Sequence, residues 1–590
     1  MSLLSIIKSK SLTTTKLHLQ NAISLNLKRQ FATKDNSKMF CYQCEQTQDG
    51  TGCNGLKGVC GKTSFVASLQ DLLLNVTKKI STFTSMSRQL GTKNPEVDRF
   101  VLESLFSTVT NVNFDEVRFK EYLQKAESQL EKAEKDYREV CQSKGIQPKM
   151  PTFAKSFWKA NPDLGSLIEE GKKFSILKRN RSKDLTGIEE MILYGIKGGA
   201  AYLEHAKVLG IEDEEAYSFM HDCLKKLTEE LSLDELLKLA MDTGKWNFKV
   251  MELLDKANTQ GYGDPVPTKV SISPVAGKCI VVSGHDLYDL ELVLKQTENK
   301  NINVYTHGEM LPAHGYPKLK KYKHLVGNYG GAWQNQKKEF SAFPGSILMT
   351  TNCIVPPSDA YRHRVFTRSV VGFPGVQHIL SDDLSPLINS ALLNKGFLKD
   401  SPRKEILVGF GHKTVLGIAD LIIDAVKSGA IKHFFLIGGC DGYELDRNYF
   451  TDFAKRVPKD CVILTLACGK YRFNKLDFGT IKHKGVEIPR LLDIGQCNDS
   501  YSAIKIAVAL AEAFKTDVNG LPLSLILSWF EQKAVAVLLT LLSLGVKNIR
   551  IGPRLPAFLT PPVVKVLVDN FGIKPISSSP KKDLKELLKK

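Results

Sequence analysis

The sequence predicts a multi-domain protein of the α + α/β class, with a helical N-terminal domain followed by two α/β domains whose sheets are mainly parallel. From about residue 64 to residue 258, apolar residues recur at three- and four-residue spacing, as in amphipathic helices. After a Gly/Pro-rich linker at 261–270, short β-branched runs alternate with helical segments. This alternation is typical of parallel sheets with crossover helices.

We therefore expect four regions in the 590-residue chain. A leader covers 1–38, and the helical domain covers 39–265. The first α/β domain covers 266–400 and the second covers 401–590, with the boundary in the polar stretch 399–404. A chain of this length is expected to divide into several domains, each with its own core.

The first 38 residues differ in composition from the rest of the chain. They contain seven Lys or Arg, ten Ser or Thr, and a single acid, Asp35. An acid-poor, basic and hydroxyl-rich leader is typical of a mitochondrial transit peptide, although a basic tail without a targeting role is the alternative. We expect import into the matrix of a mitochondrion or a mitochondrion-related organelle, with cleavage just before the first cysteines.

The overall composition, 43% hydrophobic and 24% charged, is that of an ordinary globular protein. The longest apolar stretch, Ala534 to Val546, is too short to span a bilayer, so we expect no membrane span. No run of Lys and Arg alternates with aromatic residues, which argues against nucleic-acid binding. The chain remains basic without its leader, which favours acidic partners such as small electron carriers.

Four cysteines lie close together in the stretch CYQCEQTQDGTGCNGLKGVCGK. Twelve cysteines in so long a chain are not a disulfide scaffold, and a reducing matrix disfavours a disulfide knot. A zinc ribbon usually pairs two CxxC motifs, whereas six residues separate the second pair here. Zinc and iron–sulfur both remain open from this stretch alone. The four residues are Cys41, Cys44, Cys53 and Cys60.

Seven residues of metal-ligand types each follow a strand-like run in the C-terminal half. In open α/β sheets, ligands bind at the carboxyl ends of the strands. One such cysteine would be interpreted as a small buried apolar residue, but seven residues at equivalent positions predict a common site. The seven are His285, Glu309, Cys353, Cys440, Cys468, Cys497 and Glu531.

The chemistry of these seven residues favours a polynuclear iron site. Four thiols, one imidazole and two carboxylates are more donors than a four-coordinate zinc ion uses. Soft sulfur and harder nitrogen and oxygen donors together indicate iron with sulfide and oxygen character, buried between the two α/β domains. Lys533 follows Glu531 by two residues and either places an ammonium beside the site or is an ordinary helix-start lysine.

From Met39 onward, the chain resembles the hybrid cluster protein family, also called the hydroxylamine reductase or prismane family. The resemblance extends over the whole remaining chain and rests on long, specific motifs. They are CYQC, SGHDL, YTHGEMLPAH, VGNYGGAWQ, LMTTNC, FFLIGGCDG, LTLACGKYRFNK, GQCND and SWFEQKAVAVLLTL.

The resemblance implies a helical domain and two Rossmann-like α/β domains. It also implies a hybrid 4Fe–2O–2S cluster bound by the seven residues above, with Lys533 alongside. In the family, the cysteine that matches Cys440 carries a persulfide sulfur. The four N-terminal cysteines are implied to hold a second iron–sulfur cluster.

For the N-terminal cluster, the resemblance favours a 4Fe–4S cubane over the two-iron cluster of other members. The eight residues between Cys44 and Cys53 resemble the four-iron type. The six residues between Cys53 and Cys60 are one more than that type has. This departure bears on the number of irons rather than on ligation.

The function implied by the resemblance is reduction of hydroxylamine to ammonia and water, with electrons from a donor protein such as a ferredoxin or a reductase. Glu531, Lys533 and His285 are the expected catalytic residues, and His307 is another candidate proton donor. Nitric oxide reduction and protein S-nitrosylation in nitrosative stress are the alternatives. A carbon monoxide dehydrogenase-like activity would need nickel and fits poorly with two carboxylate ligands.

The remaining candidates receive structural interpretations. His205 lies inside a helical segment and is interpreted as a solvated or core-edge histidine. His412 follows a strand-like run, as the ligands do, but matches no ligand position of the family, so its role is left open. Four further cysteines lie in helical patterns or at strand starts and are interpreted as packing residues: Cys141, Cys223, Cys279 and Cys461.

Overall fold

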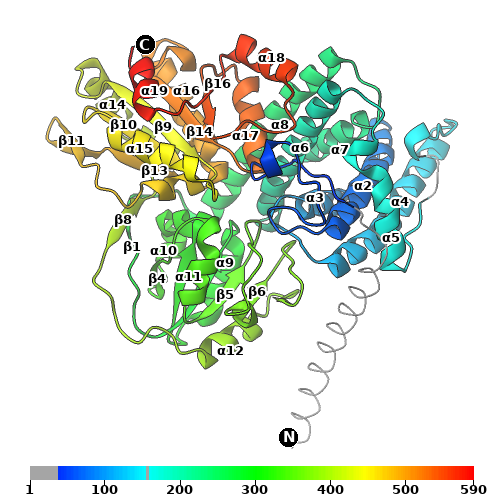
Figure 1. The fold of residues 1–590 in the computed structure, drawn as a ribbon, viewed down its shortest axis with the longest axis horizontal. Helices are drawn as coiled ribbons and strands as arrows, with labels where there is room; N and C mark the ends of the chain where they lie inside the picture. Colours follow the sequence, from blue (N-terminus) through cyan, green and yellow to red (C-terminus); the bar gives the residue numbers. More distant parts are fainter. Residues whose placement is uncertain (1–37, 155–157, 590) are drawn as a thin grey trace, which may run out of the picture.

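The computed structural model describes residues 38–154 and 158–589, which form a helical region and two sheet regions (Figure 1). The helical region, coloured blue to teal, lies on the right in this view. The first sheet region, in green, and the second, in yellow to red, lie one below the other on the left. The predicted leader lies outside the described residues except for Lys38.

The helical region contains α2 (Ser64–Gln89), α3 (Pro95–Ser107), α4 (Glu116–Ser143), α5 (Leu164–Gly171), α6 (Lys183–Val208), α7 (Glu214–Lys226) and α8 (Leu233–Tyr262). Each of these helices begins after a polar N-cap side chain that accepts a hydrogen bond from the first turn. The caps satisfy backbone N–H groups that have no partner within the helix. They are Thr63, Asn94, Asp115, Asp163, Ser182, Asp213 and Ser232.

Helix α17 (Gln532–Ser543) follows a strand of the second sheet but packs against α6 and α8. Two glycines permit this close approach. A Cβ atom at Gly198 would lie 2.3 Å from the backbone oxygen of Gln532, and one at Gly244 would lie 2.1 Å from that of Leu539. Because only glycine fits there, the start of α17 is held directly against α6.

The first sheet has six parallel strands in the spatial order β4-β3-β2-β5-β6-β7. Helices cover both faces, so the central strands are buried almost throughout. The strands are β2 (Lys278–Ser283), β3 (Ile302–His307), β4 (Leu325–Asn328), β5 (Ser346–Met349), β6 (Val365–Thr367) and β7 (Gln377–His378). The helices are α9 (Leu287–Thr297), α10 (Pro317–Lys320), α11 (Gln336–Ala342) and α12 (Ser385–Leu393).

The second sheet also has six parallel strands, in the order β13-β10-β9-β14-β15-β16. The strands are β9 (His433–Gly439), β10 (Cys461–Leu466), β13 (Leu491–Gly495), β14 (Leu523–Ser528), β15 (Arg550–Gly552) and β16 (Lys574–Pro575). Besides α17, the helices are α13 (His412–Leu416), α14 (Ala419–Lys427), α15 (Asn448–Arg456), α16 (Ser500–Phe514), α18 (Pro561–Phe571) and α19 (Pro580–Leu587).

The two sheets share one topology. In each, the first strand lies inside the sheet, the next two are added on one side and the last three on the other. This is the strand order of a doubly wound Rossmann fold, which binds ligands outside the carboxyl ends of its strands. The predicted fold class, a helical region followed by two Rossmann-like regions with mainly parallel sheets, is confirmed.

An antiparallel ribbon joins the two sheet regions. Strand β1 (Thr268–Ser271) pairs with β8 (Glu405–Val408). Each of these strands lies at the start of one sheet region, so the two regions are joined through this ribbon. A second antiparallel pair, β11 (Thr480–His483) with β12 (Val486–Pro489), forms a hairpin. The domain limits given above stay a prediction. One strand of this ribbon comes from each side of the expected boundary between the two α/β domains.

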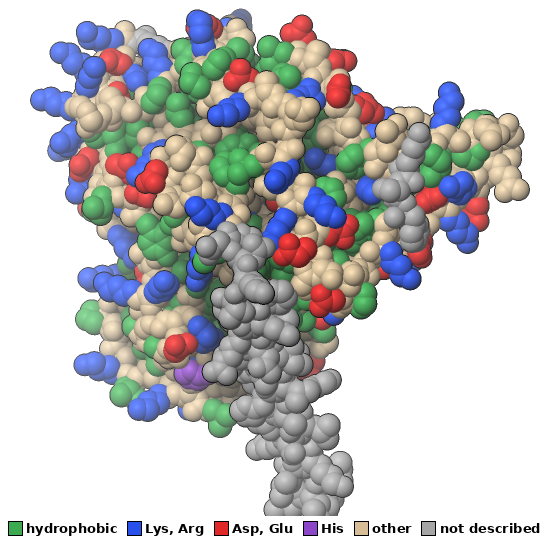
Figure 2. Space-filling model, turned by 45° about the vertical axis from the view of Figure 1, so that its right-hand side comes forward, with side chains coloured by type: hydrophobic (Ala, Val, Ile, Leu, Met, Phe, Trp, Pro, Cys, Tyr) green, Lys and Arg blue, Asp and Glu red, His purple; other side chains and the backbone are tan. Residues whose placement is uncertain are grey.

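The surface carries side chains of both charges. On the face shown in Figure 2, Lys and Arg side chains are intermixed with acidic and apolar ones. Among the described residues, no helix combines the length and the apolar character that crossing a bilayer requires.

Candidate metal centres

Each of the seven predicted ligands lies just beyond the carboxyl end of a parallel strand. They follow β2 at His285, β3 at Glu309, β5 at Cys353, β9 at Cys440, β10 at Cys468, β13 at Cys497 and β14 at Glu531. Three come from the first sheet and four from the second, so the candidate site lies between the two sheet regions. Their positions at strand ends are as predicted, while ligation itself stays a prediction.

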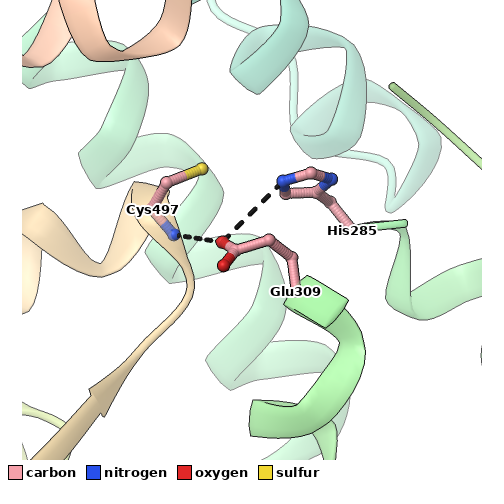
Figure 3. Close-up of side chains that lie close together, drawn as sticks. All are labelled: His285, Glu309 and Cys497. Atoms are coloured by element: carbon pink, nitrogen blue, oxygen red, sulfur yellow. Dashed lines mark hydrogen bonds and ion pairs between the residues drawn. The ribbon is translucent and has the colours of Figure 1, made fainter. Parts of the chain in front are cut away.

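His285, Glu309 and Cys497 each bring a donor atom to within 4.8 Å of the other two (Figure 3). The Nε2 atom of His285 lies 3.8 Å from Oε2 of Glu309. The same oxygen accepts a hydrogen bond from the backbone nitrogen of Cys497 over 2.8 Å. His285 and Glu309 belong to the first sheet and Cys497 to the second, so the two sheets meet at these three residues.

Neighbouring polar groups fix the orientation of His285 and Glu309. The Thr351 hydroxyl oxygen lies 3.1 Å from Nδ1 of His285 and accepts a hydrogen bond from its backbone nitrogen over 2.8 Å. The Gln496 side-chain amide donates to the backbone oxygens of His285, over 3.1 Å, and Glu309, over 2.7 Å. Such partners are the usual means by which proteins orient metal ligands.

Strained backbone lies at two of the candidate thiols. Cys353 has φ +79°, and Ala467, immediately before Cys468, has φ +61°. Left-handed conformations are uncommon for residues other than glycine, and they concentrate at functional sites. These thiols belong to one compact apolar cluster, which contains Ala332, Trp333, Val355, Cys468 and Phe530 with Cys353, Cys440 and Tyr471 packed against it.

Glu531 and Lys533 are joined through Asn352. Glu531 caps α17, since its Oε2 accepts a hydrogen bond from the backbone nitrogen of Lys533 over 2.9 Å. The Asn352 side chain donates to Oε1 of Glu531 over 3.5 Å and accepts from Nζ of Lys533 over 2.5 Å. Lys533 is 1% exposed, and its Nζ lies 5.6 Å from the centre of the Tyr202 ring. Lys533 is therefore not an ordinary helix-start lysine, because its ammonium is held inside the site.

Burial opposes the charged form of the predicted ligands. It raises the pKa of the four thiols and of Glu309 and Glu531, and it lowers the pKa of His285. Oε1 of Glu309 is buried and has no hydrogen-bond partner among the described residues. The four thiols and two carboxylates would bind metal as anions. Ionising all six inside the protein costs free energy unless nearby cations compensate their charge. The donor set therefore fits iron cations, which thiolate and carboxylate groups bind.

His205 lies in the wall of this site, which corrects its interpretation as a solvated or core-edge residue. Its ring, on α6, is 6% exposed and stacks on that of His285 with centroids 6.3 Å apart. Its Nε2 has no hydrogen-bond partner among the described residues. The sequence did carry a signal: α6 is apolar around most of its circumference, as in a central helix, so its polar side chains must face partners inside the protein.

The four N-terminal cysteines also lie together. Cys41 and Cys53 face each other in an antiparallel bridge, with backbone hydrogen bonds of 3.1 and 2.8 Å. A Cβ atom at Gly58 would lie 3.7 Å from the sulfur atoms of both Cys53 and Cys60. Burial, reinforced by the other three thiols, raises the pKa of Cys44. The arrangement suits one cluster bound by four thiolates.

Two buried lysines lie beside these thiols. Lys62 is 4% exposed and donates to Oε1 of Gln70 over 2.5 Å. Lys197 is 1% exposed and donates to Oε1 of Gln43 over 2.9 Å. Burial and the Lys62 ammonium lower the pKa of Lys197 to about 7, although the Cys41 thiolate acts in the opposite direction. A cluster held by four thiolates is anionic, so it would add to the negative charge that Glu190 and Asp71 already bring to Lys197.

His412, whose role was left open, and the four cysteines interpreted as packing residues lie outside both candidate sites. His412 begins α13, where its Nδ1 lies 2.8 Å from the Ser502 hydroxyl and 3.7 Å from the Asp255 carboxylate. This accounts for His412 as a helix-start residue. The remaining cysteines are buried in α4, α7, β2 and β10, which confirms them as packing residues: Cys141, Cys223, Cys279 and Cys461.

An apolar cavity of about 180 Å³ reaches the candidate site between the second sheet and helices α16 and α17. Its lining includes Cys440 and Cys497 at one end. It also includes Val508 and Leu544, which are 38% and 44% exposed. The cavity therefore extends from partly exposed residues to two predicted ligands, and it would admit a small uncharged molecule.

Comparison with known proteins places most of the chain in one family. The sequence model of the Prismane/CO dehydrogenase family matches residues 39–585. The hydroxylamine reductase of Rhodospirillum rubrum is 53% identical over 543 residues, covering 92% of this chain and 98% of its own. That of Geobacter metallireducens is 53% identical over 542 residues with the same coverage, and that of Maridesulfovibrio salexigens is 50% identical over 551 residues, covering 93% and 100%.

Two solved structures that share this fold are carbon monoxide dehydrogenases. A nickel-free enzyme from Thermococcus sp. AM4 aligns with TM-score 0.53 and 18% identity, covering 94% of this chain and 90% of its own. Carbon monoxide dehydrogenase IV from Carboxydothermus hydrogenoformans aligns with TM-score 0.54 and 16% identity, covering 97% of both chains. At this identity the likeness concerns the fold alone.

Proposed function

The chain belongs to the Prismane/CO dehydrogenase family, and on that premise we propose that it is an iron–sulfur oxidoreductase that reduces hydroxylamine to ammonia and water. The reaction consumes two electrons and two protons for each hydroxylamine. Relatives that are at least 50% identical over more than nine-tenths of the chain bear the name hydroxylamine reductase. The observation that carries the proposal is that seven residues of ligand types follow strand ends of the two sheets, and that three of them, from both sheets, bring donor atoms within 4.8 Å of one another.

Two iron–sulfur clusters fit these residues. The seven strand-end residues would hold the hybrid 4Fe–2O–2S cluster, and the four N-terminal cysteines would hold a 4Fe–4S cluster. When bound, the clusters supply electrons and an iron position for the substrate. The hybrid-cluster assignment is supported by buried thiols and carboxylates whose charged forms burial opposes. The assignment of the N-terminal cluster is supported by the two buried lysines that lie beside its four cysteines.

The protein side chains would handle the protons and the surroundings of the substrate. Lys533 holds its ammonium protons inside the site, where Asn352 accepts one of them in a hydrogen bond. Burial by Phe106 and Tyr202, whose rings lie 5.7 and 5.6 Å from this nitrogen, keeps water away from it. His285 is held by Thr351, and burial keeps its ring neutral, so it fits a ligand rather than a proton donor.

An anaerobic preparation tests this function directly. Metal analysis should give about eight iron per chain, the number that two four-iron clusters contain, without nickel. Electron paramagnetic resonance (EPR) should resolve two centres, and ammonia should form from hydroxylamine with a chemical reductant. Nitrosothiol transfer to a partner protein without ammonia formation would instead indicate the S-nitrosylase alternative, and the proposal would then fail.

The electron donor is proposed to be an acidic protein such as a ferredoxin. Leu56 and Val59, which lie between the ligands Cys53 and Cys60, are 58% and 57% exposed, and the exposed Lys57 lies between them. Exposed apolar groups beside a basic one would form a contact for an acidic carrier next to the N-terminal cluster.

Substitution of Lys57 by Glu tests this contact. Reduction of the variant by a ferredoxin should slow by roughly tenfold at low salt, and less at high salt, because screening weakens surface charge interactions. Reduction by dithionite should not change. Leu393→Ser, at a residue 88% exposed on α12, is the control that should leave both rates unchanged. Equal ferredoxin rates in Lys57→Glu and wild type would exclude this docking surface.

The leader is proposed to be a mitochondrial transit peptide, which would place the enzyme in the matrix. Its basic, acid-poor composition supports this. The family match also begins only at residue 39, just after the proposed cleavage region.

A further inference from the structure

A continuous chain of side-chain amides joins the two candidate centres. The Gln43 amide nitrogen donates to the sulfur of Cys41 over 3.4 Å. The Gln43 amide oxygen accepts from the amide nitrogen of Gln532 over 2.6 Å. Gln532 lies between Glu531 and Lys533 in the sequence, so the chain of contacts leads to the backbone beside the second centre. Residues nearly 500 positions apart are thus in direct contact.

The direction of each amide is fixed by its other partners. The Gln43 oxygen also accepts a hydrogen bond from Nζ of Lys197 over 2.9 Å. The Gln532 oxygen accepts one from the backbone nitrogen of Thr110 over 3.0 Å. A flip of either amide would place its NH2 group against one of these donors. The Gln43 NH2 group must therefore point at Cys41, and the Gln532 NH2 group at Gln43.

Packing leaves these groups no alternative arrangement. Gln532 is 0%, Lys197 1% and Gln43 8% exposed. Gly198, next to Lys197, brings α6 against the backbone of Gln532, where a Cβ atom would lie 2.3 Å from its oxygen. A buried and fully satisfied polar network holds its members rigidly, because breaking one contact leaves another group without a partner.

We propose that Gln43 and Gln532 are positioning residues for the N-terminal cluster, a proposal that rests on the assignment of two clusters. They set the reduction potential of that cluster and couple it electronically to the second cluster. Each transfer takes one electron from the N-terminal cluster, which is oxidised, to the second cluster, which is reduced. The donor protein then restores the first cluster. Two transfers supply the electrons for one hydroxylamine.

The effect on the reduction potential of the N-terminal cluster follows from the hydrogen bond that Gln43 donates to Cys41. An N–H group that donates to a ligand sulfur stabilises the more negative, reduced cluster and raises its potential. The Lys197 ammonium strengthens this effect, because it polarises the Gln43 amide through the shared oxygen. The coupling follows from the unbroken contact between Gln43 and Gln532, since electrons tunnel more readily through hydrogen-bonded groups than across gaps.

Two Met substitutions separate these roles, because Met retains the length of Gln without its amide. Gln43→Met should lower the midpoint potential of the N-terminal cluster by up to about 59 mV, equivalent to a tenfold change in its reduction equilibrium. Gln532→Met should shift the potential of the N-terminal cluster less than Gln43→Met does. It should slow electron transfer to the second cluster by roughly tenfold, which corresponds to a 1.4 kcal/mol change in barrier. Redox titration followed by EPR measures the first, and rapid freezing after mixing with dithionite measures the second.

Gln129→Met is the matched control. Gln129 is also a buried glutamine, 2% exposed, but its amide donates to Glu96 on the outer helices. Gln129→Met should leave unchanged both the midpoint potential of the N-terminal cluster and the rate of electron transfer to the second cluster. If Gln43→Met loses its cluster, Lys197→Met provides the same test by removing the second donor to Gln43. Unchanged potentials and transfer rates in variants that retain both clusters would overturn the relay and leave the reductase function intact. A wild-type protein without a second cluster or without ammonia formation would overturn the proposed function instead.

Discussion

The backbone nitrogen of Cys497 donates a hydrogen bond to the carboxylate of Glu309 over 2.8 Å, and this bond joins the carboxyl edges of the two sheets. Glu309 follows β3 of the first sheet, whereas Cys497 follows β13 of the second. The other oxygen of Glu309 is buried without a partner among the described residues. The carboxylate is therefore fixed on one side by the protein and open on the other, as a metal ligand must be.

Substitution Glu309→Gln tests this role. The Gln side chain can still accept the hydrogen bond from Cys497, so we expect the fold to survive. The neutral amide is a weaker ligand for iron than a carboxylate. Iron bound at the second cluster should therefore fall, while the EPR signals of the N-terminal cluster remain. Loss of a hydrogen-bond partner of a metal ligand typically costs roughly 10- to 100-fold in metal affinity, so a change in a direct ligand should cost at least about tenfold.

Glu339→Gln is the control for this experiment. Glu339 lies 3.0 Å from His307 on the same sheet but is not a predicted ligand. Its replacement should leave iron content unchanged. Iron content equal to wild type in Glu309→Gln, with circular dichroism confirming the fold, would contradict the assignment of Glu309.

The sequence could place the predicted ligands at one edge of each sheet because strand ends are visible in a single chain. A buried parallel strand is recognised by its β-branched run, and the residue that follows it, such as Cys440 after FFLIGG, lies at the binding edge. His205 and Gln532 could not be recognised in this way. Their roles depend on which helix faces the site, and that depends on the docking of α6 against α17. Such contacts join distant segments, so no strand-end pattern marks them, and the only local sign for His205 was the mostly apolar character of α6.

Substitution Cys44→Ser tests the division into two centres. The four N-terminal thiols lie together at one end of the amide chain, and Cys44 is buried among them. Serine is a poor ligand for iron–sulfur clusters, so the N-terminal EPR signals should disappear while those of the second cluster persist. Reduction of hydroxylamine with an artificial donor should exceed that with a protein donor.

The control for this variant is Cys223→Ser. Cys223 is fully buried in α7 and lies outside both sites, so its replacement should leave both sets of signals in place. Loss of both centres in a folded Cys44→Ser protein would show that the two sites are not independent.

Removal of the leader should leave the enzyme active. None of the predicted ligands precedes Cys41, and the family match begins at residue 39. A protein that starts at Met39 should therefore match the full chain in turnover per iron. A fusion of residues 1–38 to a fluorescent reporter should reach a mitochondrion-type organelle. A reporter that stays in the cytosol would contradict the proposed targeting.

Substitution Glu531→Gln tests whether the carboxylate at the start of α17 acts in catalysis or only caps the helix. The structure shows a cap, since Glu531 accepts a hydrogen bond from the backbone nitrogen of Lys533 over 2.9 Å. It also shows that Oε1 lies 3.5 Å from Asn352, which holds the Lys533 ammonium. Because carboxylate–iron bonds exchange more readily than thiolate–iron bonds, we expect Glu531 to define the iron position where hydroxylamine binds.

Turnover and stability separate these two roles. If Glu531 is a ligand at the substrate position, Glu531→Gln should lower hydroxylamine turnover per iron by at least about tenfold, or 1.4 kcal/mol of transition-state stabilisation. If it is only a cap, the change should cost about 1 kcal/mol or less of stability and leave turnover per iron unchanged. Asp213→Asn is the control for capping, because Asp213 caps α7 far from the site through a bond of 2.9 Å to Ala216. Thermal unfolding of both variants, with steady-state kinetics and iron content measured on the same samples, decides between a ligand and a cap.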